Sequence, residues 1–97
     1  MTEGRHRVTE TKTDITTSIR EVLETYGQLA VDIQTITDTD DLFRAGMTSL
    51  ANVTVMLGLE SAFGVEFPEQ MLHRRTFESI SAIRAAVEEL LGQDEAT

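Results

Sequence analysis

Ser49 is the side chain in this sequence best placed by its surroundings to do chemistry. It stands in the stretch 46–50, GMTSL, where a glycine is followed by two residue types that favour helix starts. The N-terminus of a helix has unpaired N–H groups and a partial positive charge, which stabilise a phosphoryl group placed there. Two interpretations remain open. Ser49 is either an ordinary capping serine or a hydroxyl presented for modification through a phosphate.

Other kinds of chemical site lack support. Asp38 and Asp40 have the first spacing of a calcium-binding loop, but its sixth and twelfth positions hold neither the glycine nor the glutamate required. His6 and His73 are far apart in the sequence, which gives no basis for a zinc site. No Gly-x-Ser-x-Gly motif surrounds Ser49, and no phosphate-binding glycine loop occurs. We therefore expect no metal site and no catalysis by this chain alone.

The elements that must position Ser49 are predicted to be helices in an all-α, four-helix bundle. Apolar residues recur at helical spacing in three main segments, and a proline can start a short fourth. A long loop of about residues 27–48 is expected between helices one and two, pinned by its apolar residues and containing a short helical turn near 40–43. The expected organisation is a disordered tail at 1–13, one domain at 14–92 and a frayed tail at 93–97, with helices at about 14–26, 48–63, 68–73 and 79–91.

The second predicted helix has two apolar arcs. Residues 55, 56, 59, 62 and 63 gather on one side, whereas Leu50, Val53 and Leu57 gather on nearly the opposite side. A helix in a small bundle buries one such arc, so we expect the Leu50–Val53–Leu57 stripe to be exposed as a docking surface. The alternative is that neighbouring helices cover both arcs.

Length and charge limit the function classes. The chain has 97 residues, enough for one modest core, and a net charge of -9, which disfavours nucleic acid as a partner. No apolar run is long enough to cross a membrane, and the polar start is not a signal peptide. Cysteine is absent, so the chain has no thiol of its own. We expect a monomer that stays in the cytoplasm.

Residues 41–50 (DLFRAGMTSL) resemble the phosphopantetheine attachment site of acyl and peptidyl carrier proteins. The following residues 53–64 look like the second helix of that family, and residues 65–68 (VEFP) and 76–80 (TFESI) resemble the segments leading into helices three and four. The resemblance covers about residues 15–91. It implies that a phosphopantetheinyl transferase attaches 4′-phosphopantetheine from coenzyme A to Ser49, so that the arm supplies the missing thiol.

One departure from the family bears on the pathway. Typical fatty-acid carriers have an aspartate before the serine and acidic residues along helix two, whereas Thr48 stands before Ser49 here and Glu60 is the one charge between Ser49 and Phe63. Fatty-acid synthesis is therefore in doubt. The site 46–49 and Phe67-Pro68 are more similar to carriers served by seryl-tRNA-synthetase-like amino acid:carrier protein ligases. That resemblance implies loading with glycine or alanine and a downstream aminoacyl acceptor.

The same resemblance makes the surface around Ser49 a candidate contact region for a ligase or transferase. The candidate contact residues are Met47, Thr48, Leu50, Val53, Thr54, Leu57, Arg74 and Arg75. A solvated helix end is an alternative explanation for the basic pair Arg74 and Arg75. Two other functions stay open: an acyl carrier of a lipid or polyketide pathway, and an unmodified helical adaptor in which Ser49 is only a cap.

Overall fold

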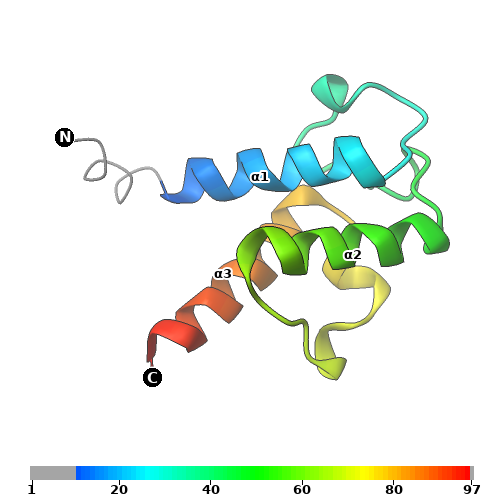
Figure 1. Ribbon diagram of the computed structural model, residues 1–97. Coiled ribbons are helices and arrows are strands. Elements are labelled where there is room, and N and C mark those ends of the chain that lie inside the picture. The colour runs from blue at the N-terminus through cyan, green and yellow to red at the C-terminus, as the bar shows by residue number, and fades with distance from the viewer. Residues whose placement is uncertain (1–10, 97) are drawn as a thin grey trace.

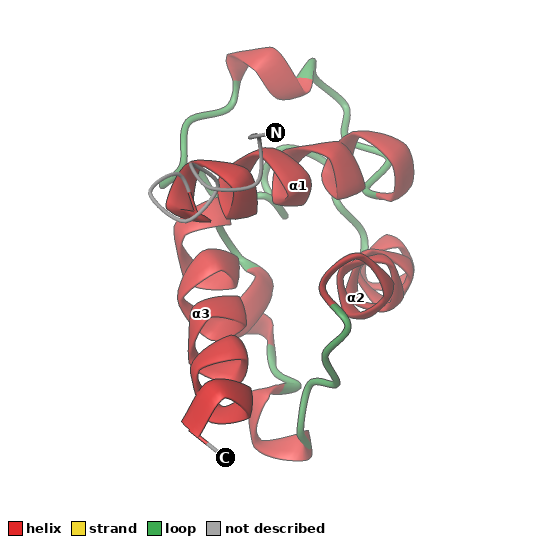
Figure 2. Ribbon diagram, turned by 60° about the vertical axis from the view of Figure 1, so that its left-hand side comes forward, coloured by secondary structure: helices red, strands yellow, loops and turns green. Residues whose placement is uncertain are grey.

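Three α-helices and three short 3₁₀ helices form the part of the chain that the computed structural model describes, residues 11–96 (Figures 1 and 2). Those residues contain no strand, which confirms the all-α prediction. The α-helices are α1 (Thr11–Tyr26), α2 (Ser49–Phe63) and α3 (Ile80–Ala96), and the 3₁₀ helices are η2 (Ile33–Thr35), η3 (Glu69–Met71) and η4 (Arg74–Phe77).

Helix α2 has the predicted bounds because both of its ends are capped. Thr48 has an extended backbone and accepts a hydrogen bond from the Ala51 amide, and Gly64 closes the other end in the left-handed conformation. The other two helices are longer than predicted. Helix α1 begins at Thr11 rather than Asp14, since no glycine or proline interrupts residues 11–13, and α3 continues through Gly92 to Ala96. Residues 1–10 of the predicted tail lie outside the described residues.

One apolar core joins the three helices. The predicted stripes of α1, α2 and α3 contribute fully buried side chains, among them Ile19, Val55 and Ile83. Tyr26 is an exception, because it is 41% exposed at the end of α1. Its ring lies against Gly58 of α2, where a Cβ atom would be 2.9 Å from the tyrosine Cδ2. The missing side chain at Gly58 thus lets α1 and α2 approach closely, as they lie side by side in Figure 1.

The long loop between α1 and α2 is held by buried apolar residues and by Arg20. Ile33, Ile36 and Leu42 are buried as predicted, whereas Val31 is exposed. The Arg20 guanidinium donates to the carbonyl oxygens of Ile33 at 3.1 Å and Ile36 at 2.9 Å. It also donates to Asp38 Oδ1 at 2.8 Å. These bonds fix the loop that leads to Ser49. The predicted turn near 40–43 is present at residues 42–46, where the Ala45 amide donates to the Asp41 carbonyl at 3.1 Å, and the loop also contains the 3₁₀ helix η2.

The prediction of one short helix at 68–73 is wrong. This part of the chain forms two separate 3₁₀ helices, η3 and η4. Pro68 precedes η3 with an extended backbone and gives no side-chain cap, so only three residues continue the turn. The chain then turns again, which lets Phe77 enter the core and contact Phe67 edge to face, with ring centroids 5.2 Å apart. Figure 2 shows this segment crossing from the end of α2 to the start of α3, and η4 packs against α3.

Candidate functional site

Ser49 is the first residue of α2 and its side chain is exposed to solvent. The capping hydrogen bond belongs to its neighbour, because Thr48 Oγ1 accepts from the Ala51 amide at 3.0 Å. Within the described residues, Ser49 Oγ has no hydrogen-bond partner. The interpretation of Ser49 as the helix cap is therefore wrong, and its side chain is exposed to solvent.

The environment of this hydroxyl suits an anion. The Thr48 side chain accepts a hydrogen bond from the Ala51 amide, and the Thr48 carbonyl accepts one from the Asn52 amide at 2.9 Å. The amides of Ser49 and Leu50 precede the first turn of backbone bonds and point out of the helix end. The first turn of α2 contains no acidic residue. A phosphate on Ser49 would therefore meet N–H groups and no opposing carboxylate.

Gly46 shapes the turn that leads to Ser49. Its φ of +117° lies in the region that residues with a side chain rarely adopt, and a Cβ atom there would be 2.6 Å from the Ala30 amide nitrogen. The Ala30 amide in turn donates to the Ala45 carbonyl at 2.8 Å. Glycine is thus required by the backbone conformation and by the contact between two parts of the loop, rather than by the approach of a partner to Ser49.

The predicted stripe on α2 lies at the surface. Leu50 is 79% exposed, Val53 49% and Leu57 54%. The opposite arc contains the buried residues Val55 and Leu59. The alternative in which neighbours cover both arcs is therefore wrong, and α2 presents an apolar face outward from Leu50 to Leu57. Thr48, Thr54, Arg74 and Arg75 are also exposed.

Met47 does not belong to this surface. Its side chain is 2% exposed and forms part of the core. Its amide donates to the Leu42 carbonyl at 3.1 Å, which turns the chain inward just before the helix starts. The prediction that Met47 contacts a partner is therefore corrected, because burial leaves no side-chain surface to contact.

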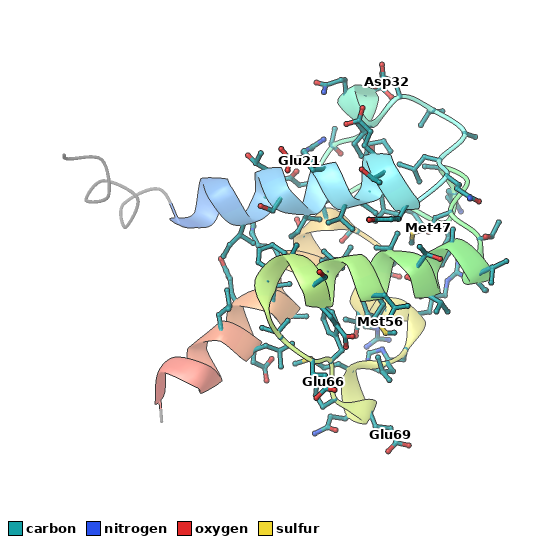
Figure 3. All side chains as sticks on the ribbon, viewed as in Figure 1. Glu21, Asp32, Met47, Met56, Glu66 and Glu69 are labelled. Carbon is teal, nitrogen blue, oxygen red and sulfur yellow. The ribbon has the colours of Figure 1, made fainter. Side chains whose placement is uncertain are left out.

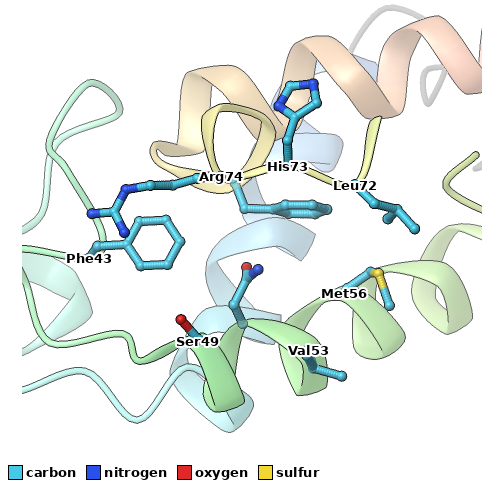
Figure 4. Close-up of a pocket in the computed structure, with 9 residues that line it drawn as sticks. Phe43, Ser49, Val53, Met56, Leu72, His73 and Arg74 are labelled. Atoms are coloured by element: carbon cyan, nitrogen blue, oxygen red, sulfur yellow. The ribbon is translucent and has the colours of Figure 1, made fainter. Parts of the chain in front are cut away.

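A pocket of about 360 Å³ opens beside Ser49, between α2 and the segment that contains η4 (Figure 4). It brings together Ser49, Val53 and Arg74 from the predicted set, whereas Leu50, Thr54, Leu57 and Arg75 do not line it. The lining residues are Phe43 from the loop, Ser49, Asn52, Val53 and Met56 from α2, and Leu72, His73, Arg74 and Phe77 from the facing segment.

Two polar groups stand out in this pocket, the predicted residue Arg74 and Asn52, which was not singled out by the sequence. The Arg74 guanidinium lies over the Phe43 ring, 4.0 Å from its centroid, which holds a positive charge in the pocket wall. Asn52 Oδ1 is buried and has no hydrogen-bond partner among the described residues. A signal for Asn52 exists in the sequence, since residues 49, 52, 53 and 56 share one helical face.

A family model decides the identity of this arrangement. The model described as a phosphopantetheine attachment site matches residues 13–87. The chain belongs to the phosphopantetheine attachment site family. Members of this carrier family are non-catalytic, and membership assigns a covalently attached 4′-phosphopantetheine group to this chain.

One relative of this carrier is named for an aminoacyl group, and similar solved structures contain carrier proteins bound to a glycine ligase. It is 47% identical over 79 residues to an aminoacyl carrier protein of Agrobacterium fabrum, covering 81% of this chain and 95% of that protein. It is similar to a chain in the crystal structure of an engineered Bradyrhizobium japonicum glycine:[carrier protein] ligase complexed with a carrier protein from Agrobacterium tumefaciens and ATP. That match has a TM-score of 0.76 at 45% identity, with 77% of this chain and 97% of that chain covered. A chain in the Bradyrhizobium japonicum ligase complexed with a glycylated carrier protein matches with a TM-score of 0.60 at 26% identity, covering 78% and 97%.

The residues around Ser49 fit the phosphopantetheine group. An exposed hydroxyl with no hydrogen-bond partner in the described chain stands at a helix N-terminus, and Arg74 places a cation in the adjoining pocket. Asn52 Oδ1 offers an unpaired acceptor to a ligand with N–H or O–H groups. When bound, the group supplies a terminal thiol, which this carrier lacks because it has no cysteine. No helix in residues 11–96 is long and apolar enough to span a bilayer.

Proposed function

We propose that this protein is an aminoacyl carrier whose 4′-phosphopantetheine arm is attached to Ser49 and loaded with glycine or alanine by a separate ligase. Attachment at Ser49 is supported by one observation at the start of α2. Thr48 caps the helix and leaves the Ser49 hydroxyl exposed. The aminoacyl cargo is supported by the 47% identity to an aminoacyl carrier protein and by the likeness to carriers complexed with a glycine ligase.

The chemistry of attachment needs little from the carrier. Ser49 Oγ attacks the phosphorus that joins pantetheine to the rest of coenzyme A, the phosphoanhydride bond breaks and 3′,5′-ADP leaves. The hydroxyl proton passes to a base of the phosphopantetheinyl transferase, because no titratable side chain of this chain hydrogen-bonds Ser49 Oγ in the described residues. The carrier contributes an accessible oxygen and the positive end of α2, which favours the phosphodiester product.

The exposed stripe supplies the contact surface for the ligase. Leu50, Val53 and Leu57 run along α2 from the attachment site, so a partner that reaches the arm also meets these side chains. Thr48 and Thr54 add hydroxyls to the same surface. Arg74 offers positive charge in the pocket wall, and the exposed Arg75 offers it outside the pocket. Burial of such a stripe on binding gives apolar contacts without charged groups to desolvate.

The charge of α2 distinguishes this function from that of an acyl carrier for a lipid or polyketide pathway. Glu60 is the one charged residue of the helix, and its carboxylate accepts a hydrogen bond from the Phe67 amide at 2.9 Å. The helix therefore presents a single half-buried carboxylate, already bonded to a backbone amide, to a basic patch on a partner enzyme. Membership in a family that carries phosphopantetheine also favours a modified carrier over an unmodified adaptor.

A loading assay tests the cargo. The purified protein is first converted to its modified form with a transferase and coenzyme A, and then incubated with ATP, an amino acid:carrier protein ligase and separate candidate acids. Intact-protein mass spectrometry should show thioester formation with glycine or alanine and none with a fatty acid. Loading with a fatty acid by an acyl ligase, and none with amino acids, would replace this proposal by the acyl-carrier alternative.

A pair of serine variants provides the control for the attachment site. Ser49→Ala should block modification and all later loading. Ser61→Ala removes an exposed serine from the far end of the same helix and should leave both steps unchanged. Modification of the Ser49→Ala protein would show that the arm is attached elsewhere.

A further inference from the structure

One permanent cation lies in the wall of the pocket beside Ser49. The nine residues that line this pocket include no aspartate or glutamate, although the whole chain has 17 acidic residues against 8 arginines and lysines. Arg74 is the one arginine or lysine among them. In the view of Figure 4, its guanidinium and Ser49 lie toward the same end of the pocket. The attachment site therefore has a local charge opposite to that of the chain as a whole.

The Arg74 guanidinium is held in place while its donors stay unused. It stacks over the Phe43 ring, 4.0 Å from the centroid, which restricts the side chain without engaging its N–H groups. In the described part of the chain, the ion pairs join Arg20 and Arg84 to Asp38, and none includes Arg74. Stacking occupies the face of a guanidinium, whereas its N–H donors lie in its plane. Those donors can therefore bind two oxygens of one phosphate.

We propose that Arg74 is a phosphate-binding residue of this carrier, and that its guanidinium N–H groups donate to the phosphodiester formed on Ser49. This inference rests on attachment of the arm to Ser49. The phosphodiester is the first group of the arm, so it stays next to the start of α2 wherever the rest of the arm lies. Its two non-bridging oxygens accept hydrogen bonds and share one negative charge, which matches the geometry and charge of a guanidinium.

Such a contact also reduces an electrostatic obstacle to modification. The chain carries a net charge of -9 and coenzyme A is a polyanion, so the two repel each other as the transferase brings them together. Arg74 lowers this repulsion at the place where the phosphate is transferred, whereas a charge elsewhere on the surface is screened beyond about 10 Å at 0.1 M salt. An exposed ion pair changes a rate up to about five-fold, which corresponds to about 1 kcal/mol.

Phosphorus-31 nuclear magnetic resonance of the modified protein tests the contact without any enzyme. Once mass spectrometry has shown the arm on Ser49, the phosphodiester resonance of Arg74→Gln should be shifted from that of the native protein at low salt. High salt should reduce this difference, because it weakens an exposed ion pair. Arg75→Gln is the matched control, since Arg75 is exposed next to Arg74 and does not line the pocket. It changes the net charge equally and should leave the resonance in place.

A second measurement needs no variant. In the native protein, the Nε–H resonance of Arg74 should shift between the unmodified and modified forms, whereas that of Arg75 should not. Transferase kinetics then test the consequence for modification. At saturating coenzyme A and low salt, Arg74→Gln should lower kcat/KM for the carrier about five-fold, and Arg75→Gln should lower it less than two-fold. Arg74→Lys keeps the charge and should recover most of the rate.

Each negative result has its own meaning. An unmodified Ser49 would overturn the proposed function itself. A modified protein in which either the phosphorus shift or the Arg74 shift is absent would overturn the phosphate contact and leave the carrier function standing. Slower modification of Arg74→Gln without these shifts would assign Arg74 to a contact with the transferase instead. Equal effects of Arg74→Gln and Arg75→Gln would reveal a general effect of net charge, which also overturns the inference.

Discussion

Adjacent residues at the start of α2 should respond in opposite ways to replacement by alanine. Thr48 caps the helix through a 3.0 Å bond to the Ala51 amide, whereas Ser49 Oγ has no such bond within the described residues. Thr48→Ala should therefore lower the free energy of unfolding by about 1 kcal/mol. For a domain of this size, that loss lowers the melting temperature by about 4–8 °C. Ser49→Ala should change the free energy of unfolding by less than about 0.5 kcal/mol.

The effects on modification should be reversed. Thr48→Ala keeps the Ser49 hydroxyl and should still accept the phosphopantetheine arm, whereas Ser49→Ala should accept none. Denaturant unfolding measures the first quantity by linear extrapolation, and intact-protein mass spectrometry measures the second. Thr54→Ala is the control for a threonine that caps nothing. It lies in the middle of α2 on the surface, so its stability should be unchanged or slightly higher, because alanine is the better helix former.

The reasoning has a clear point of failure. If Ser49→Ala lost as much stability as Thr48→Ala, Ser49 would share the capping role, and the exposed hydroxyl would no longer be explained by modification. If both variants kept full stability, the cap geometry that separates the two residues would have no energetic meaning.

Three further predictions concern the surface stripe, the turn and the loop. Leu50→Asp should raise the ligase KM for the carrier about ten-fold or more without loss of stability, because it removes an exposed apolar contact. Ala62→Asp, a change at an exposed residue near the other end of α2, should leave this KM unchanged. Equal KM values for the two variants would exclude the stripe as the ligase contact. Gly46→Ala should cost about 1–3 kcal/mol of stability in denaturant unfolding, because φ is +117° there, and a neutral result would refute the strained turn. Arg20→Ala should lower the free energy of unfolding by about 1–3 kcal/mol, and Asp38→Ala should lower it by less, because Arg20 also binds two loop carbonyls. Equal losses of stability in denaturant unfolding would contradict this ranking.

The sequence predicted α2 well because its signals are local. Thr48 and Gly64 mark the helix ends by their own backbone preferences, and the spacing of Leu50, Val53 and Leu57 shows which side a small bundle leaves open. The all-α architecture followed from the same periodicity in α1 and α3. Such features depend on residues within a few positions of each other, so one sequence suffices to find them.

Features that depend on distant contacts were missed. Pro68 suggested one short helix, but burial of Phe77 against Phe67 divides the segment into η3 and η4. Met47 looked like surface because it precedes Ser49, yet the bond of its amide to the Leu42 carbonyl turns it into the core. The pocket also joins α2 to a segment about twenty residues later. Local spacing places residues 49, 52, 53 and 56 on one helical face, but it does not show which distant segment faces them.

The most direct test of the central claim is the site at which the arm is attached. The native protein is incubated with a broad-specificity phosphopantetheinyl transferase and coenzyme A, digested, and sequenced by tandem mass spectrometry. We predict that the phosphopantetheine mass appears on Ser49 and is absent from Ser49→Ala. Recovery of the peptide that contains Ser49 without added mass, or with the mass on another residue, would contradict the account.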